Sequence, residues 1–317
     1  TDATIKITIY NRKLNLKEFR QSLMLPGKKD NLDQYRGEYN RMLQDKAEAT
    51  QNMVQEKYIT VSVNKKTIEE ARAAFGRIGI DLATNLSTLS SVALVQDNQE
   101  RLKLLYDFFR PEDEPDLNIN LKELMRRGHN FKDSICPDSM QFKADHFEMD
   151  DKVGRVLFLK DYASFIRDDM VAKLTDVSRN IMLSIDILPI PTDEAVKEIQ
   201  NKILAVETDI TRWQRKQNEN YNFSATIPYE MELMRTETKE FLDDLTARDE
   251  RMMFALLTVV HLADDLEQLN ADTEALQSAA KTSFCNLSIL RWQQEDGLNT
   301  VLPYGLRRIH TLRTLNT

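Results

Sequence analysis

The predicted strands and helices follow the same order in the two halves of the chain, and this repeat constrains the fold more than any other feature. Each half reads as a strand, two helices, a strand, a helix, a strand and a final helix. The first strands of the two halves lie about 176 residues apart, and the later elements are offset by about 194 to 198 residues. The predicted strands are 5–10, 59–63 and 92–96, and then 181–188, 253–262 and 286–292. The predicted helices are 15–24, 31–56, 67–88 and 98–110, and then 193–219, 229–248, 265–284 and 295–302.

Local patterns support these assignments. In the first strand, Ile5, Ile7 and Ile9 are separated by single residues of other types, which is the period of a β-strand. Thr67 and Glu70 have the spacing of a capping box, in which two side chains satisfy the first backbone N–H groups of a helix. The residues that follow are apolar at every third or fourth position, so an amphipathic helix is predicted there.

The repeat predicts an α/β (α+β) fold of two related lobes, each made of short sheets backed by helices. The first lobe is expected to span 1–110. The second is expected to span 179–317 and to include a long helical hairpin at 193–248. Between them, 111–178 is expected to form a connector with a β-hairpin or meander followed by a helix at about 161–177.

The helical hairpin is predicted from two apolar seams that flank a polar loop at 218–226. Apolar residues recur every three or four positions in both seams, as in helices that pack along their length. The seams are Val196, Ile199, Ile203, Val206, Ile210 and Trp213, and Met231, Met234, Thr238, Phe241 and Leu245. Two interpretations stay open. Either the seams pack on each other or on a sheet, or part of the hairpin docks another protein.

No motif for nucleotide binding, metal binding or nucleophilic catalysis is found in the sequence. Its eight glycines form neither the G-x-x-x-x-G-K-[ST] loop that wraps phosphates nor a G-x-G-x-x-G fingerprint. His146, Glu148 and Asp150 would share one face of a strand, and a solvated strand face explains this group better than a metal site. We therefore predict that this chain has no catalytic, cofactor-binding or metal-binding residue and no enzyme activity of its own.

Two basic patches form the candidate interaction surface. They consist of Arg212, Trp213, Arg215 and Lys216 at the end of a predicted helix, and of Arg307, Arg308, His310 and Arg313 near the end of the sequence. Cations at a helix C-terminus also complement the helix dipole, so the first patch has a structural explanation as well. We interpret the second patch as a surface that contacts a neighbouring domain. The formal net charge of −8 disfavours nucleic-acid binding, because phosphate backbones are repelled by an acidic surface.

The sequence predicts no transmembrane segment. Its longest apolar run, 252–263, is far shorter than the roughly 20 residues that cross a bilayer. The two cysteines, Cys136 and Cys285, are far apart and lack CxxC spacing, which fits a reducing compartment.

Seven stretches of the sequence carry a family resemblance. They are VQEKYITVSVNKKTIEEARAAFGRIGIDL (54–82), RRGHNFKDSICPD (126–138), GRVLFLKDYASFIRDDMV (154–171), MLSIDILPIPTDEAV (182–196), ILAVETDITRWQRKQNENYNFSATIPYEME (203–232), EFLDDLTARDERMMFALLTVVHLAD (240–264) and EDGLNTVLPYGLRRIHTLRTL (295–315). They resemble the VirB-four-like conjugal transfer ATPases of integrative conjugative elements in Gram-positive bacteria, which are relatives of TrbE and CagE. The resemblance extends over nearly all of the chain.

The resemblance implies an amino-terminal, non-catalytic domain of a type IV secretion motor. Such motors are cytoplasmic, lie at the inner face of the cell membrane and energise the transfer of DNA between cells. ATP and Mg are then expected only in a RecA-like domain that follows this region. The implied partners are inner-membrane components of the secretion channel, the chain's own ATPase domain and, in the full-length hexamer, further copies. An alternative function is contact with the transferred single-stranded DNA through the two basic patches.

Overall fold

A computed structural model gives the structure of the protein for residues 3–13, 23–49, 53–111, 121–162, 169–177, 179–222, 226–248 and 251–316. The strands are β1 (Ala3–Lys13), β2 (Met53–Val63), β3 (Met140–Phe142), β4 (Phe147–Met149), β5 (Lys152–Asp161), β6 (Ile181–Pro189), β7 (Met252–Ala263), β8 (Asn286–Ile289) and β9 (Arg313–Asn316). The helices are α2 (Asp33–Ala49), α3 (Ile68–Thr88), α4 (Asn98–Phe109), α5 (Leu121–Arg126), α6 (Lys132–Ile135), α7 (Asp169–Thr175), α8 (Thr192–Glu219), α9 (Tyr229–Ala247), α10 (Leu266–Lys281) and α11 (Gln294–Val301).

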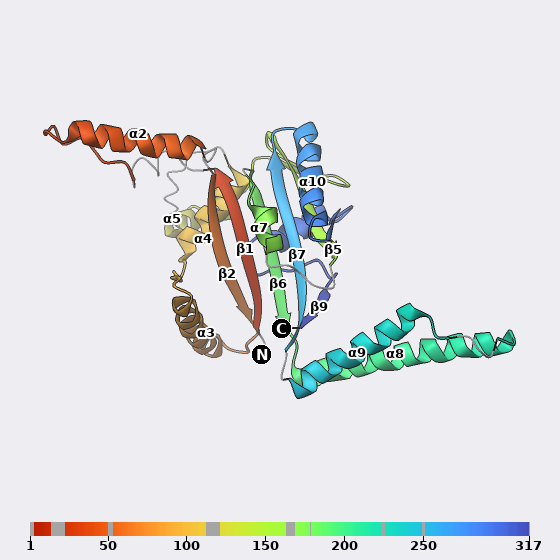
Figure 1. Cartoon of the computed structure of the whole chain (residues 1–317). Coiled ribbons are helices and arrows are strands. Elements are labelled where there is room, and N and C mark those ends of the chain that lie inside the picture. Colours follow the sequence, from red (N-terminus) through yellow and green to blue (C-terminus); the bar gives the residue numbers. More distant parts are fainter. Residues whose placement is uncertain are drawn as a thin grey trace. The chain divides into compact units, whose positions relative to one another are not determined.

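The predicted α+β class is confirmed, because the described strands form an antiparallel sheet backed by helices. The strand order is β2-β1-β6-β7-β5-β4-β3, with β8 paired to β5 and β9 paired to β7 (Figure 1). β2 is therefore an edge strand. The strands β1 and β2 come from the first half of the sequence and lie in the same sheet as β6 and β7 from the second half.

The chain divides into two compact units. The larger unit contains Ile5–Ile185 and Leu256–Thr311, and the smaller contains Thr1–Thr4, Asp186–Ala255 and Leu312–Thr317. The boundaries 1–110, 111–178 and 179–317 stay a prediction.

The internal repeat has a direct structural counterpart in the larger unit. Thr8 on β1 and Ser184 on β6 share a hydrogen bond of 2.8 Å between their hydroxyl groups, and both side chains are fully buried. These residues are 176 positions apart, which is the offset between the first strands of the two predicted halves. In two antiparallel strands related by a local twofold axis, only residues next to the axis lie opposite their own equivalents. The Thr8–Ser184 contact therefore supports a twofold relation between β1 and β6.

One face of the sheet in the larger unit is covered by α7 and α10 (Figure 1). Met170 and Leu174 on α7 and Leu276 and Ala280 on α10 pack against apolar residues of β5, β6, β7 and β8. Those strand residues are Leu157, Leu159, Ile181, Leu183, Leu257, Val259 and Leu287. Burial of this apolar surface is the main force that holds the helices on the sheet.

A buried glutamine completes one edge of β5. β4 pairs with β5 only as far as Gly154, and β8 pairs with it from Leu157 onward. In the gap, the Gln294 side chain accepts a hydrogen bond from the Val156 N–H at 2.8 Å and donates to the Val156 carbonyl at 3.2 Å. The same carbonyl also accepts from the Leu290 N–H at 3.1 Å. The Gln294 side chain thus supplies the acceptor for the Val156 N–H, a backbone group that is costly to bury unpaired.

Most predicted elements of both halves are confirmed to within a few residues. The predicted helix 31–56 is too long, because α2 ends at Ala49 and β2 begins at Met53. The predicted helix 161–177 is found only as α7, and its residues 163–168 lie outside the described residues. Most of the predicted helix 15–24 also lies outside them.

The predicted strand at 92–96 is wrong, because these residues form an irregular connection without strand pairing. α3 ends in a Schellman-type turn, in which the Ser91 N–H donates to the Leu86 carbonyl at 2.9 Å and Ser90 has a φ of 56°. α4 then begins with a capping box formed by Asp97 and Glu100. The intervening residues have strand propensity, but strand propensity depends on a neighbouring strand and on burial.

Candidate interaction surface

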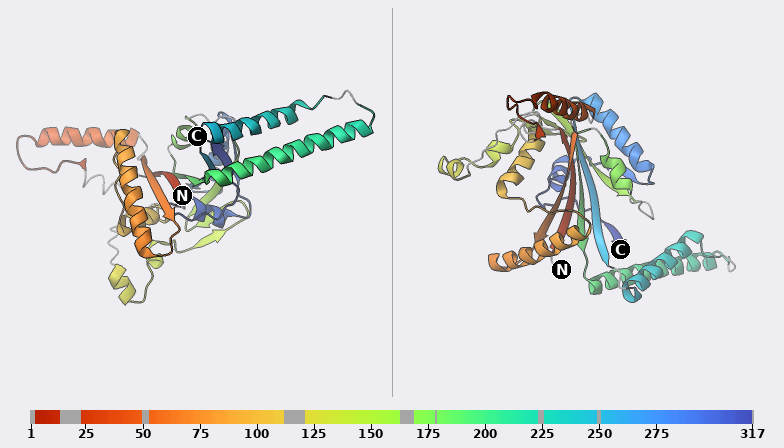
Figure 2. Two further views of the ribbon diagram at one scale, coloured as in Figure 1. Left: turned by 90° about the horizontal axis from the view of Figure 1, so that it is seen from below. Right: turned by 60° about the vertical axis from the view of Figure 1, so that its left-hand side comes forward.

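The hairpin α8–α9 belongs to the smaller unit, and its base is anchored in a small apolar core. Ala195 and Ile199 of α8 and Leu245 of α9 are buried together with Met252 of β7. Ile190, Val196, Ile203, Phe241, Leu242 and Phe254 pack around them. The helices run side by side in every view (Figures 1 and 2). Their packing confirms the prediction of an antiparallel helical hairpin.

The predicted seams account for the buried side of the hairpin with one exception. All six seam residues of α8 are buried or half-buried, and so are Met231, Thr238, Phe241 and Leu245 of α9. Met234 is the exception, since it is 56% exposed. Its neighbour Arg235 lies nearer to α8, and Arg235 Nε is 2.7 Å from the carboxylate of Glu207.

An ionic contact fixes the register of the two helices beyond the apolar base. Glu207 on α8 accepts from Arg235 and lies 3.4 Å from Lys239 Nζ, both on α9. The hydrogen bond from Arg235 holds the pKa of Glu207 below its ordinary value. Because these groups are solvent-accessible, we expect this contact to orient the helices rather than to contribute much stability.

Away from its base, the hairpin exposes large apolar side chains. Leu233 and Met234 on α9 are 41% and 56% exposed. Leu204, Tyr221 and Tyr229 are also exposed. The sequence analysis predicted none of these exposed side chains as a surface feature, and its seam pattern placed Met234 on the buried side. Leu233 and Met234 are adjacent in sequence, and contiguous exposed apolar side chains are typical of protein contact sites.

The first predicted basic patch lies on the last turns of α8. Arg212, Arg215 and Lys216 are exposed, and Trp213 is half-buried. Arg212 lies 3.5 Å from Asp209 on the same helix. The structure thus places the four residues on one helix end, and their role in binding stays a prediction.

The second predicted patch is divided between the two compact units. Arg307 and Arg308 belong to the larger unit, and Arg313 lies on β9 of the smaller unit, paired with Ala255 of β7. The Arg308 guanidinium is 3.6 Å from Asp296, and the Arg308 N–H donates to the Thr300 hydroxyl at 2.9 Å. These contacts tie Arg308 to α11, and its role in binding stays a prediction.

A buried polar cluster in the larger unit was not predicted as a group. His261 Nε2 and Arg155 both contact the Thr273 hydroxyl, at 3.1 and 2.9 Å. Nearby, Arg179 forms an ion pair of 2.9 Å with the buried carboxylate of Asp272. Arg155, Arg179 and His261 lie on other segments than Asp272 and Thr273, which fall within a predicted helix. No short sequence motif therefore reveals the five residues as a group. The cluster joins β5 and β7 to α10.

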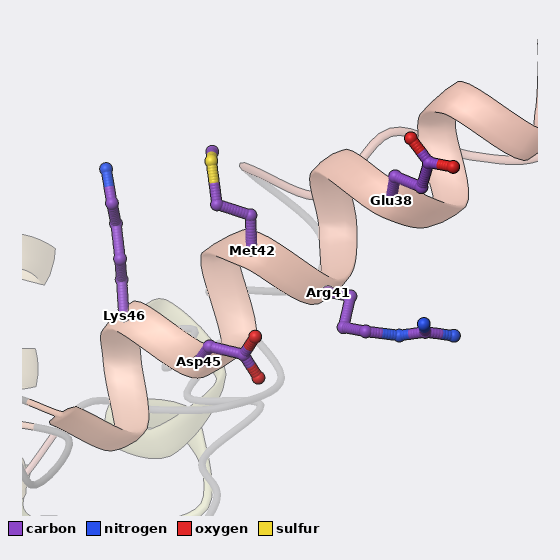
Figure 3. Close-up of a pocket in the computed structure, with 5 residues that line it drawn as sticks. All are labelled: Glu38, Arg41, Met42, Asp45 and Lys46. Atoms are coloured by element: carbon purple, nitrogen blue, oxygen red, sulfur yellow. The ribbon is translucent and has the colours of Figure 1, made fainter.

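Among the residues that the structure describes, no group of three or more His, Cys, Asp and Glu side chains could hold a metal ion. His146 contacts Asp145 at 2.8 Å and lies 3.8 Å from Glu148. A shallow hollow on α2 is lined by Glu38, Arg41, Met42, Asp45 and Lys46 (Figure 3). All five belong to one helix, so the hollow is part of an open helix surface.

Comparison with known proteins assigns no family. No protein-family model matches the chain, and no curated protein matches it significantly. Within the described part of the chain, no helix has both the length and the apolar character needed to cross a membrane.

Proposed function

We propose that this chain is a non-catalytic docking and assembly domain of a conjugative DNA-transfer ATPase. The observation that carries the proposal is the hairpin α8–α9, which is anchored at its base and exposes Leu233 and Met234. A helical hairpin with exposed apolar side chains suits the binding of another protein, because burying those side chains under a partner is favourable. The sequence resemblance to VirB-four-like ATPases supplies the cellular setting.

In this proposal, the partner at the hairpin is an inner-membrane component of the type IV secretion channel. The protein acts in the cytoplasm as a peripheral component at the inner face of the membrane. ATP and Mg bind in a separate ATPase domain of the full-length protein, and this chain supplies no catalytic group. Further copies of the full-length motor are also expected to assemble with it.

Lysine substitutions on the exposed face of α9 test the proposal. The double variant Leu233→Lys, Met234→Lys in the full-length protein is expected to lower DNA-transfer frequency from donor cells at least about tenfold. The fraction of the protein that sediments with membranes is expected to fall in parallel. Both side chains are substantially exposed, so the fold should be little affected.

Thr236→Lys is the matched control. Thr236 is an exposed residue of the same helix, so this variant adds a cation without removing an apolar side chain. It should transfer DNA at the wild-type level. Wild-type transfer and wild-type membrane sedimentation by the double variant would contradict the proposed docking role of the hairpin.

A further inference from the structure

The connection between α3 and α4 exposes an apolar segment. Val92, Leu94 and Val95 are 86%, 86% and 94% exposed. No hydrogen bond to residues 92–96 is found within the described chain. The Schellman-type turn before it and the capping box after it hold both ends. A segment with fixed ends loses less conformational entropy when it becomes ordered on binding than a free chain does.

The internal repeat shows what covers the equivalent segment in the second half. The counterpart of 92–96 is β8, which pairs with β5. β5 also pairs with β7 along its other edge, from Val153 opposite Ala263 to Phe158 opposite Thr258. β7 is the counterpart of β2. One strand, β5, therefore lies between β7 and β8 and supplies backbone hydrogen-bond partners to both of them.

Among the residues that the structure describes, no strand takes the position of β5 in the first half. β2 ends the order of the described strands (Figure 1). None of its residues is fully buried, whereas all but two residues of β7 are. The segment 92–96 likewise has no strand beside it among the described residues. In the described part of the chain, the edge of β2 and the segment 92–96 are therefore both left without a neighbouring strand. They are the counterparts of β7 and β8, which β5 joins in the second half.

We propose that the outer edge of β2 and residues 92–96 bind an extended strand of a partner protein, which occupies the position that β5 occupies in the second half. The partner supplies backbone N–H and C=O groups to both sides, as in other cases of β-strand addition. This inference stands independently of the motor proposal, since it rests only on the repeat, the strand pairing and the exposure of 92–96.

The sequence of β5 indicates the chemistry of the partner strand. β5 is rich in β-branched, leucine and phenylalanine residues and lacks proline, and its residues 154–157 and 159 are buried. A partner strand is thus expected to contain about ten extended residues, mostly apolar, without a proline that would remove a backbone donor. A peptide with the sequence of residues 152–161, KVGRVLFLKD, is a suitable probe.

The test uses the full chain and this peptide in solution. We expect the peptide to slow amide hydrogen exchange at residues 92–96 and along β2 at least about tenfold, because new backbone hydrogen bonds protect these amides. A control peptide of the same length in scrambled order, with prolines in place of two central residues, should give no protection. Absence of protection by the 152–161 peptide at millimolar concentration would overturn the inference.

Substitutions at a single position separate strand addition from simple apolar contact. Leu94→Pro and Val95→Pro each remove one backbone N–H donor. Successive N–H groups of a strand point to opposite sides, so one of these two donors faces the incoming strand. The more affected variant should bind the peptide at least about tenfold more weakly, whereas Leu94→Ala and Val95→Ala should lose only a few-fold. Equal losses for proline and alanine would contradict strand pairing. Self-association of the wild-type chain that either proline variant abolishes would identify a second copy as the occupant and overturn the assignment to a partner protein.

Discussion

Replacing Lys6 by alanine is expected to lower the free energy of unfolding of the larger unit by about 3–5 kcal/mol. Lys6 on β1 is only 2% exposed, although it is charged. Its ammonium group donates hydrogen bonds to the backbone carbonyls of Thr300, Leu302 and Leu306, the last at 2.9 Å. These carbonyls end α11 and the loop after it, so Lys6 fastens the end of that helix to the sheet. Alanine would leave buried carbonyls unpaired and a cavity in place of the side chain.

Urea unfolding followed by circular dichroism measures this effect. Lys13→Ala is the control, because Lys13 lies on the same strand but is exposed. Its expected change is within about 0.5 kcal/mol. A loss of less than about 1 kcal/mol for Lys6→Ala would show that the carbonyl contacts contribute little net stability.

Acidification below pH 6.5 is expected to destabilise the larger unit through His261. This side chain is buried on β7, and burial, together with the nearby charges of Arg155 and Arg179, lowers its pKa to about 3. In the unfolded chain the pKa is near the ordinary value of 6.5. Between these two values the unfolded state binds a proton that the folded state does not. Stability is therefore full above pH 6.5 and falls as the pH decreases, with a slope that approaches about 1.4 kcal/mol per pH unit.

Denaturant unfolding at pH 7, 6 and 5 tests this prediction in the range where ordinary carboxylates stay ionised. The wild-type chain should lose about 2 kcal/mol or somewhat less over this range. His261→Gln keeps a polar group near Thr273 and removes the titration, so its stability should vary far less with pH. Parallel slopes for the two proteins would assign the pH dependence to other groups.

Sequence periodicity located the elements well but did not show which side of a strand is buried. Alternation identified β1, yet Lys6, Thr8 and Tyr10 are the fully buried residues, and Ile5, Ile7 and Ile9 are half-buried. The face with Lys6 is covered because α11 and the loop after it supply carbonyl acceptors. Those acceptors lie about 300 residues away in sequence, so local patterns could not predict them.

The hairpin was predictable because it depends on the local spacing of apolar residues. The predictions that failed, for Met234 and for residues 92–96, have a common cause. Met234 fits the apolar period, but the ionic contact between Glu207 and Arg235 turns it outward. Residues 92–96 fit a strand pattern, but no described strand lies beside them. In both cases the outcome depends on a partner distant in sequence. The same applies to Gln294, whose side chain supplies the acceptor for the Val156 N–H of β5.

The coding sequence that follows Thr317 tests the central claim most directly. The proposed role as the docking domain of a transfer motor predicts a strand pattern followed by G-x-x-x-x-G-K-[ST] within a few hundred codons, since the ATPase needs this loop to bind phosphates. A stop codon without such a motif would contradict the motor proposal.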